Sequence, residues 1–272
     1  MSPFDTAVHA AAAAIREAEV LLVGAGAGMG VDSGLPDFRG DRGFWNAYPP
    51  YEALGLTFMD AANPEHFTAD PPFGWGFYGH RLGLYRATVP HDGFGILRRL
   101  PSFVFTSNVD GQFQKAGFDP ARIVEVHGSI HHLQCTEPCC IDIWDAREEV
   151  EVDLATMRSR SVPRCRRCRG VARPNILMFG DFAWLHERTR AQEERFLAFL
   201  EAHRGRRVAI VELGAGKAIP SVRMKSEHLA RGPRAVLVRI NPREADGPAG
   251  TVSIPAGALD GLRAIDAALA GG

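Results

Sequence analysis

The sequence predicts an α/β fold, in which a Rossmann-like, doubly wound parallel sheet carries helices on both faces. Short apolar runs recur along the chain, helix-forming stretches separate several of them, and a glycine-rich turn directly follows the first run. Apolar runs without polar alternation are typical of parallel strands, which are buried on both faces. These runs occupy residues 20–23, 103–105, 123–124, 208–211 and 236–238.

The overall composition excludes several classes of protein. The 272 residues are 46% apolar and 23% charged, which is enough to bury a large core and rules out a disordered chain. The net charge of -1 gives no reason to expect a nucleic acid partner. No apolar run reaches the length of a membrane span, and the N-terminus lacks the basic-then-apolar order of a signal peptide. We therefore expect a cytoplasmic protein with neither a membrane nor a nucleic acid partner.

Helices are expected before and after the strands. Residues 5–18 are rich in Ala, Ile, Arg and Glu, and residues 189–202 and 259–269 form similar stretches. Two segments do not fit the alternation of strands and helices. Residues 41–95 are rich in aromatic residues, Pro and Gly, and the segment 130–176 holds all the cysteines. Both are predicted to be insertions into the sheet domain.

The spacing of the five cysteines indicates a metal site. Cys135 with either Cys139 or Cys140 forms one close pair, and Cys165 with Cys168 forms the other. Four thiolates complete the tetrahedral coordination of Zn²⁺ and leave no open position for water, so the predicted zinc is structural. The expected domains are a dinucleotide-binding domain of residues 1–40, 96–129 and 177–272, a helical insertion of residues 41–95, and a zinc-binding module of residues 130–176.

The turn after the first apolar run is predicted to bind a phosphate. Residues 24–30 read Gly-Ala-Gly-Ala-Gly-Met-Gly, and small residues let the backbone approach a pyrophosphate. The spacing is not the strict G-x-G-x-x-G, and no Gly-Lys-Ser/Thr of a P-loop follows. Instead, residues 33–40 form a loop in which Phe38 offers an aromatic ring and Arg39 a guanidinium for phosphate. This combination favours nucleotide chemistry without hydride transfer.

Gly26-Ala27-Gly28 followed by residues 33–40 resembles the hallmark motif of the sirtuins, which are NAD-dependent protein deacylases. Residues 106–111 resemble the family's Thr-Gln-Asn-Ile-Asp-Gly, with Ser107 in place of Gln. Residues 127–128 match the family's His-Gly, and residues 173–181 resemble Arg-Pro-x-x-Val-x-Phe-Gly-Glu, with Asp181 in place of Glu. Motifs in the family's order thus span residues 20–241.

The resemblance implies that NAD is consumed in removing an acyl group from a protein lysine. The acyl oxygen attacks the ribose as nicotinamide leaves, and His127 deprotonates a ribose hydroxyl, giving free lysine and O-acyl-ADP-ribose. The implied catalytic residues are His127, Asn108 and Asp110. The implied cofactor-binding residues are Gly26, Ala27, Gly28, Asp37, Phe38, Arg39, Ser107, Asn108, Asp110, Gly214, Ala215, Gly216 and Asn241.

Further expectations concern the substrate and the metal. Tyr78 and Arg81 resemble the Tyr-x-x-Arg pair with which desuccinylase-type sirtuins hold an acidic acyl chain, and Leu177, Phe179 and Gly180 are expected to bind the substrate peptide. Sirtuins have Gly-Thr-Ser where this chain has Gly214, Ala215 and Gly216, so dinucleotide binding is predicted to be weakened. The family's Cys-x-x-Pro-Cys favours Cys139 over Cys140 as the zinc ligand, which gives the set Cys135, Cys139, Cys165 and Cys168.

Two other functions are compatible with the sequence. The same NAD site could transfer ADP-ribose to a protein side chain, as a mono-ADP-ribosyltransferase does. A non-catalytic NAD-binding or nucleic-acid-binding module is the other alternative, because five arginines lie around the second cysteine pair and could contact an acidic partner or nucleic acid. These are Arg164, Arg166, Arg167, Arg169 and Arg173.

Overall fold

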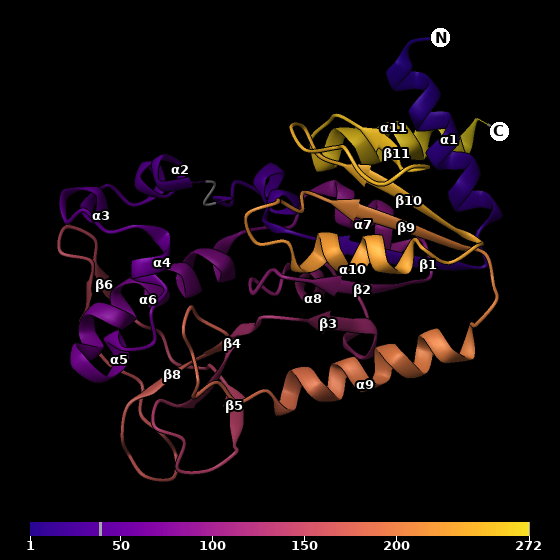
Figure 1. The fold of residues 1–272 in the computed structure, drawn as a ribbon. Coiled ribbons are helices and arrows are strands. Elements are labelled where there is room, and N and C mark those ends of the chain that lie inside the picture. Colours follow the sequence, from indigo (N-terminus) through magenta and orange to yellow (C-terminus); the bar gives the residue numbers. More distant parts are fainter. Residues whose placement is uncertain (38–39, 272) are drawn as a thin grey trace.

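A parallel sheet of six strands forms the larger lobe of the molecule (Figure 1). The computed structural model describes residues 1–37 and 40–271. The strand order is β11-β10-β9-β1-β2-β3, which is the doubly wound order of Rossmann folds, so the predicted fold class is confirmed. The strands are β1 (Val20–Ala25), β2 (Ser102–Thr106), β3 (Ile123–Glu125), β9 (Val208–Leu213), β10 (Ala235–Ile240) and β11 (Val252–Ile254).

The apolar runs of the sequence form the middle of this sheet. Every residue of β1 is buried, and Val23 pairs with Val104 of β2 on one side and with Val211 of β9 on the other. The sequence did not predict strand β11, because its three residues include a serine and do not form an apolar run. Only Ile254 of this strand is buried. All strands of the sheet are parallel, but the order in which they follow one another along the chain reverses between β1 and β9, where a crevice is expected at their carboxyl ends.

Helices cover both faces of the sheet (Figure 1). The predicted first helix is α1 (Pro3–Glu17), whose N-terminus is fixed by a capping box between Ser2 and Asp5. One face of the sheet packs on buried side chains of α1, α7 (Asp92–Arg98) and α11 (Ala258–Ala270). The other face packs on α9 (Glu187–Ala202) and α10 (Ser221–Leu229), chiefly through Phe196 and Val222.

The two inserted segments meet in a second, smaller lobe. Its sheet is antiparallel, in the order β5-β4-β8, and a two-stranded hairpin of β6 and β7 lies beside the longest helix, α6. The strands are β4 (Gly128–Cys135), β5 (Ile143–Asp145), β6 (Val152–Asp153), β7 (Arg158–Ser159) and β8 (Ala172–Ile176). The helices are α2 (Gly40–Ala47), α3 (Pro49–Ala53), α4 (Phe58–Ala61), α5 (His66–Ala69) and α6 (Pro71–Ala87).

Short helical turns complete the connections. They are η1 (Ala27–Met29), η2 (Val31–Ser33), α8 (Gln112–Lys115) and η3 (Pro120–Arg122). The glycine-rich turn after β1 thus continues into two 3₁₀ turns rather than into the long α-helix of a dehydrogenase-type dinucleotide fold.

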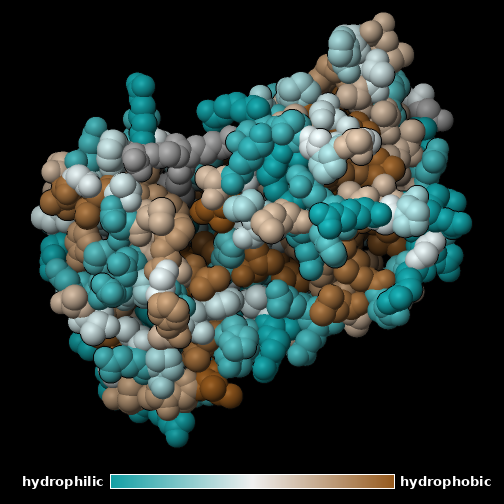
Figure 2. Space-filling model, in the orientation of Figure 1, coloured by the Kyte–Doolittle hydropathy of each residue, from teal (hydrophilic) through white to brown (hydrophobic). Residues whose placement is uncertain are grey.

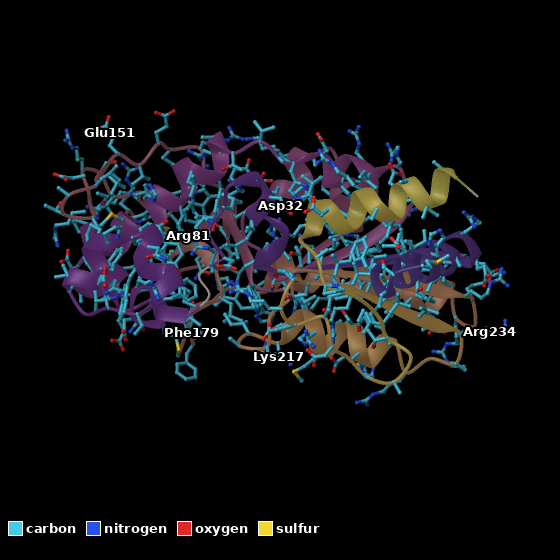
Figure 3. The ribbon with its side chains drawn as sticks, turned by 90° about the horizontal axis from the view of Figure 1, so that it is seen from above. Asp32, Arg81, Glu151, Phe179, Lys217 and Arg234 are labelled. Carbon is cyan, nitrogen blue, oxygen red and sulfur yellow. The ribbon has the colours of Figure 1, made fainter. Side chains whose placement is uncertain are left out.

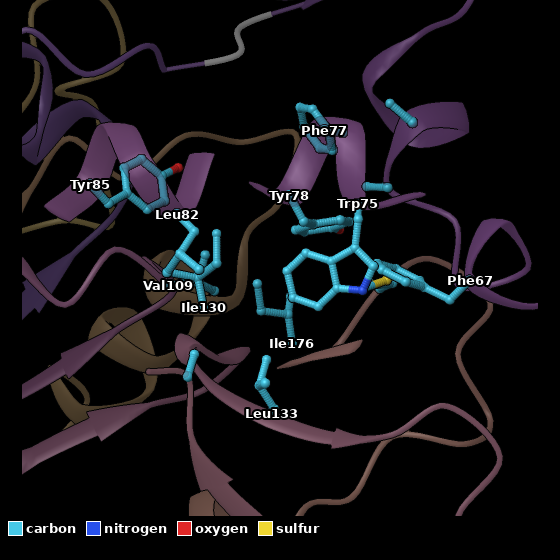
Figure 4. Packing of buried hydrophobic residues seen from close by; sticks show 14 of the residues in the cluster. Phe67, Trp75, Phe77, Tyr78, Leu82, Tyr85, Val109, Ile130, Leu133 and Ile176 are labelled. Carbon is cyan, nitrogen blue, oxygen red and sulfur yellow. The ribbon is translucent and has the colours of Figure 1, made fainter. Parts of the chain in front are cut away.

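Trp75 lies at the centre of the second lobe's core and joins the two inserted segments (Figure 4). Its ring is fully buried against Phe67, and its indole N–H donates to the backbone oxygen of Ala172 at 2.8 Å. One helix turn of α6 thereby hydrogen-bonds strand β8, about a hundred residues away in the sequence. The two insertions of the sequence therefore form a single core.

A hollow separates the two lobes, and apolar residues gather in it (Figure 2). We propose that the lobes correspond to the expected dinucleotide-binding domain and to a small domain made of both insertions, which also takes in residues 177–179, because Met178 and Phe179 pack in the small lobe's core. Helix α7 begins at Asp92, inside the range 41–95, yet its Phe94 packs into the core of the large sheet. Among the described residues, no helix has the length and hydropathy that a membrane span needs.

Candidate functional site

A cavity of about 360 Å³ lies between the two lobes, at the point where the sheet order reverses. Arg81 and Phe179 lie on the part of the small lobe nearer the sheet, whereas Glu151 lies at its far end (Figure 3). Both lobes line the cavity. The residues from the first lobe include Gly26, Ala27, Asp37, Ser107, Asn108, Asp110, His127, Gly214 and Gly216, and those from the second include Tyr78, Arg81, Tyr85, Leu177 and Phe179.

The floor of the cavity is a contact between two glycine-rich loops. The Gly28 N–H donates to the Gly214 carbonyl at 3.0 Å, and a Cβ on Gly28 would lie only 2.7 Å from the Gly214 Cα. A Cβ on Gly26 would lie 2.7 Å from the Ala215 Cα. These glycines therefore allow the loop after β1 to touch the loop after β9. Of the two, Gly26 lines the cavity and Gly28 lies behind it.

Asn108 and Asp110 follow β2 and reach the cavity from the same sheet edge. The Asn108 side-chain amide donates to the Gly26 carbonyl at 3.0 Å, which ties this segment to the glycine turn. Asp110 is 8% exposed and accepts the Gln112 N–H at 2.9 Å. Burial raises the pKa of Asp110 to about 6, although the Gln112 hydrogen bond acts in the opposite direction. Asp110 thus titrates close to neutral pH.

His127 lies between β3 and β4 and lines the cavity. Its Nε2 lies 3.1 Å from the Ser221 hydroxyl, at the start of α10. Burial lowers the pKa of His127, and a hydrogen bond with the Ser107 backbone only partly opposes this shift. The imidazole is therefore neutral at pH 7 and is suited to accept a proton.

Arg81 lies on α6 and lines the cavity. Its Nε and Nη2 donate to the Tyr85 hydroxyl at 3.0 and 2.7 Å, and its guanidinium lies 5.6 Å from the centroid of the Tyr78 ring. The side chain is only 6% exposed, so a full positive charge is held inside the small lobe. This charge is therefore stabilised by the Tyr85 hydroxyl, one helix turn further on, and by the face of the Tyr78 ring.

The segment after β8 borders the cavity on its other side. The Leu177 N–H donates to the backbone carbonyl of His127 at 2.9 Å. This hydrogen bond fixes the segment after β8 beside His127. Asp181 then turns the chain through a buried ion pair, in which two oxygens each lie 2.8 Å from a nitrogen of Arg173. Leu177 remains 39% exposed at the rim of the cavity.

Four cysteine sulfurs form a cluster in the small lobe. Those of Cys135, Cys139, Cys165 and Cys168 all lie within 4.8 Å of one another. The distances from Cys135 to Cys168 and from Cys139 to Cys165 are 3.6 and 3.7 Å. Zinc with sulfur ligands at about 2.3 Å in a tetrahedron needs sulfurs about 3.8 Å apart, so the four residues fit a structural Zn²⁺. The Cys140 sulfur lies outside this group of four and 3.7 Å from that of Cys139.

The structure brings together most, but not all, of the residues expected at the site. Ala215, Asn241 and Gly180 do not line the cavity. The Asn241 amide donates to the Ala215 carbonyl at 3.1 Å and so supports the loop after β9 from behind. Phe38 and Arg39 lie outside the described residues.

Some lining residues escaped the sequence analysis. Tyr85 carries a usable signal, because it lies one helical turn after Arg81. Others are apolar residues outside the quoted motifs that only the fold brings to the cavity, namely Phe58, Ala62, Ala218 and Ile219.

The sheet order, the cavity at its reversal point and the four-cysteine cluster together define a Rossmann-like protein with an inserted metal-binding module. The model of the Sir2 family matches residues 26–196. This match covers more than half of the chain, and the chain therefore belongs to the Sir2 family.

Relatives and solved structures agree with this family. The chain is 31% identical over 224 residues to an NAD-dependent protein deacylase of Aquifex aeolicus, which covers 80% of this chain and 82% of the relative. It is 33% identical over 161 residues to an NAD-dependent protein deacetylase of Saccharolobus solfataricus, where the match covers 57% of this chain and 58% of the relative. A Sir2 homologue in complex with NAD shares the fold, with a TM-score of 0.70, 20% identity, and coverage of 96% of this chain and 93% of that one.

Proposed function

We propose that this chain is an NAD-dependent protein-lysine deacylase that releases nicotinamide, free lysine and O-acyl-ADP-ribose. One observation carries the proposal: a neutral imidazole, His127, lies in a cavity that also holds Asn108, Asp110 and the glycine turn of a Rossmann-like sheet. The names of the curated relatives support it, since they are NAD-dependent protein deacylases and deacetylases. The cellular site proposed for this reaction is the cytoplasm.

The first lobe would hold NAD. The backbone of Gly26 and Ala27 would lie against the pyrophosphate, and Gly214 and Gly216 would admit the adenosine half from the other loop. Asn108 and Asp110 would hold the nicotinamide carboxamide. The Asn108 amide can donate to the carboxamide oxygen, and the Asp110 carboxylate can accept from the carboxamide N–H. In our proposal Ala215 and Asn241 shape the adenosine side from behind the cavity wall, and Phe38 and Arg39 keep the roles that the family resemblance implies.

His127 would act as the general base. Once the acyl oxygen has displaced nicotinamide, a ribose hydroxyl must lose its proton before it can attack the acyl carbon. Burial lowers the pKa of His127, so the imidazole is unprotonated at neutral pH and can take that proton. The apolar residues that close the cavity exclude water until the acyl oxygen has arrived.

A single experiment tests the whole proposal. Acetyl- and succinyl-lysine peptides are incubated with labelled NAD, and the peptide, nicotinamide and sugar products are followed by mass spectrometry. We expect deacylated peptide and O-acyl-ADP-ribose in equal amounts, and a loss of about 10²–10⁴-fold in the His127→Ala variant. The same variant should keep its zinc content and circular dichroism. Label fixed on protein, with no sugar ester formed, would instead identify an ADP-ribosyltransferase.

We also propose that the cavity accepts acidic acyl chains such as succinyl. Arg81 contributes a buried guanidinium to the cavity wall, with the rings of Tyr78 and Tyr85 at 5.6 and 5.3 Å from it. The Arg81 N–H groups now donate to the Tyr85 hydroxyl. A carboxylate accepts hydrogen bonds from a guanidinium more strongly than a neutral phenol does, so the carboxylate of a succinyl group would compete with Tyr85 for these N–H groups. In this arrangement the Tyr85 hydroxyl would orient the guanidinium, and the Tyr78 ring would pack against it.

The variant Arg81→Met distinguishes this acyl preference from a general effect on the site. Methionine keeps much of the length of the side chain and removes its charge. We expect desuccinylation to fall at least tenfold more than deacetylation, since one charge-assisted hydrogen bond contributes about 1.5–3 kcal/mol. Tyr85→Phe is the companion variant and should weaken desuccinylation to a smaller extent. Equal losses on acetyl and succinyl peptides in Arg81→Met would contradict the acyl preference.

The acyl-lysine peptide would enter between Leu177, Phe179 and Ile219, which border the cavity from opposite lobes. Strand β8 is the edge of the order β5-β4-β8, so an extended peptide can pair beside the segment that follows it, including Gly180. The proposed partner is therefore an acyl-lysine protein. Zinc held by Cys135, Cys139, Cys165 and Cys168 would stabilise the small lobe and take no part in the chemistry.

A further inference from the structure

The His127 ring contacts a residue that no family motif of this sequence contains. Its Nε2 lies 3.1 Å from the hydroxyl of Ser221, which is 94 residues further along the chain. His127 belongs to the turn between β3 and β4, whereas Ser221 is the first residue of α10. The hydrogen bond therefore joins two separate elements beside the cavity.

Ser221 is held rigidly at this position. Pro220 is the N-cap of α10, and no side chain caps the helix, so the Ser221 hydroxyl does not serve as a cap. Two residues on, Arg223 anchors the helix by donating to the Glu244 carbonyl at 2.8 Å, and Val222 is fully buried against the sheet. The hydroxyl is thus presented to His127 by an anchored helix start and is not needed for helix formation.

A general base needs one ring nitrogen without a proton, aimed at the group that it will deprotonate. In a neutral imidazole, the partners of the two nitrogens decide which one carries the proton. The Ser107 backbone hydrogen-bonds the His127 ring in the sense that favours a ring N–H. When the Ser221 hydroxyl donates its proton to Nε2, the proton of the neutral ring is on Nδ1.

We propose that Ser221 is a positioning residue that holds the His127 imidazole by its Nε2 and keeps that nitrogen unprotonated in the cofactor-free protein. This inference rests on the proposed role of His127 as the base. Ser221 itself does not line the cavity and is not assigned to the chemistry. When the ribose arrives, its hydroxyl takes over the acceptor that Ser221 has kept in place.

Three variants at position 221 test the inference. Ser221→Ala removes the hydroxyl, while Ser221→Thr and Ser221→Val share one shape and differ only in the hydroxyl. Ser226→Ala is the matched control, because Ser226 lies on the same helix, is fully buried and has no hydrogen-bond partner among the described residues. Long-range ¹H–¹⁵N spectra of the cofactor-free protein report which ring nitrogen of each histidine carries the proton. The signals of His127 are identified as those that disappear in the His127→Gln variant.

We expect the wild type, Ser221→Thr and Ser226→Ala to show one His127 tautomer with the proton on Nδ1. Ser221→Ala and Ser221→Val should show shifted signals of mixed tautomers. The kcat of these two variants should fall about tenfold, because a tenfold loss corresponds to the contribution of one ordinary hydrogen bond. Their KM for NAD should be unchanged. Threonine should restore most of kcat.

Two results would overturn the inference: unchanged His127 signals in Ser221→Ala, or altered signals with an unchanged kcat. A wild-type protein that consumes no NAD would overturn the proposed function instead. The spectra would still decide whether Ser221 holds the ring, because they need no NAD.

Discussion

Two titrating side chains share the cavity, and both should shape its pH dependence. Burial raises the pKa of Asp110 to about 6, and burial also keeps the pKa of His127 below its ordinary value. Asp110 is proposed to accept from the nicotinamide carboxamide as a carboxylate, and His127 must be neutral to act as a base. Both active forms are present at pH 7 and are lost as the pH falls.

The expected pH profile of kcat/KM for NAD is therefore a plateau near pH 7 and a decline as the pH falls through about 6. In Asp110→Asn the first of these titrations disappears, so any acid limb that remains should come from His127 alone, whose pKa burial lowers from its ordinary value. The measurement is a rate profile from pH 5 to pH 8 in buffers of constant ionic strength. An acid limb that stays at the same pH in Asp110→Asn would show that Asp110 does not control it.

The buried pair Arg173–Asp181 should contribute much more to stability than an exposed pair of the same geometry. Neither side chain is exposed, and Asp181 also accepts the Ala183 N–H at 3.1 Å. Asp181→Asn leaves the Arg173 charge buried without a counter-charge, so the free energy of unfolding should fall by about 3–5 kcal/mol. The measurement is urea unfolding followed by circular dichroism.

The matched control for that variant is Asp70→Asn. Asp70 also makes two hydrogen bonds with an arginine, Arg158, at 2.7 and 2.8 Å, but both side chains are more than two-fifths exposed. Water screens this pair, so its removal should leave the unfolding midpoint nearly unchanged. Similar losses in the two variants would contradict the role of burial.

At the scale of the elements, the contact between the loops after β1 and β9 should govern both stability and NAD affinity. Gly28→Ala places a Cβ 2.7 Å from the Gly214 Cα, and backbone cannot rotate away as a side chain could. We expect a destabilisation of about 1–3 kcal/mol and a weaker NAD complex, measured by thermal unfolding and by calorimetry.

Gly95→Ala provides the opposite case. Gly95 lies in α7, a Cβ there would meet nothing within 4 Å, and the residue is exposed. Because glycine weakens a helix, this change should stabilise the protein by about 0.5–1 kcal/mol and leave NAD binding unaltered. If Gly28→Ala bound NAD as the wild type does, the loop contact would not shape the nucleotide site.

At the scale of the whole molecule, removal of zinc should loosen one lobe before the other. Trp75 and Trp144 belong to the core of the small lobe and Trp45 packs against it, while among the described residues the two sheet cores hold no tryptophan. The fourth tryptophan, Trp184, lies between β8 and α9 and belongs to none of the three cores. Tryptophan fluorescence therefore reports chiefly on the small lobe, and far-ultraviolet circular dichroism reports on all helices.

A chelator should thus shift the fluorescence transition to lower temperature and leave much of the helical signal in place. The variants Cys139→Ser and Cys140→Ser form a matched pair of neighbouring residues. We expect the first to lose the bound zinc, as measured by mass spectrometry of the native protein, and the second to retain it. Coincident transitions of both signals without zinc would show that the lobes unfold as one unit.

Much of this architecture was predictable because the signals are local. The strands at residues 20–23 and 208–211 are apolar runs long enough to identify on their own, and the structure extends them to Val20–Ala25 and Val208–Leu213. Strand β11 lacks such a run and depends on its neighbour β10 for its conformation. The match of the chain to the Sir2 family confirms the resemblance that the motifs indicated.

The sequence by itself determined the fold class, the family and the grouping of the cysteines, because each depends on residue types at short spacings. Only the tertiary structure decided that Tyr85 hydrogen-bonds Arg81, that Ser221 meets His127, and that both insertions share one core. Contacts between residues far apart in the chain depend on how the elements pack, and packing is set by the summed shape of many side chains rather than by any local pattern.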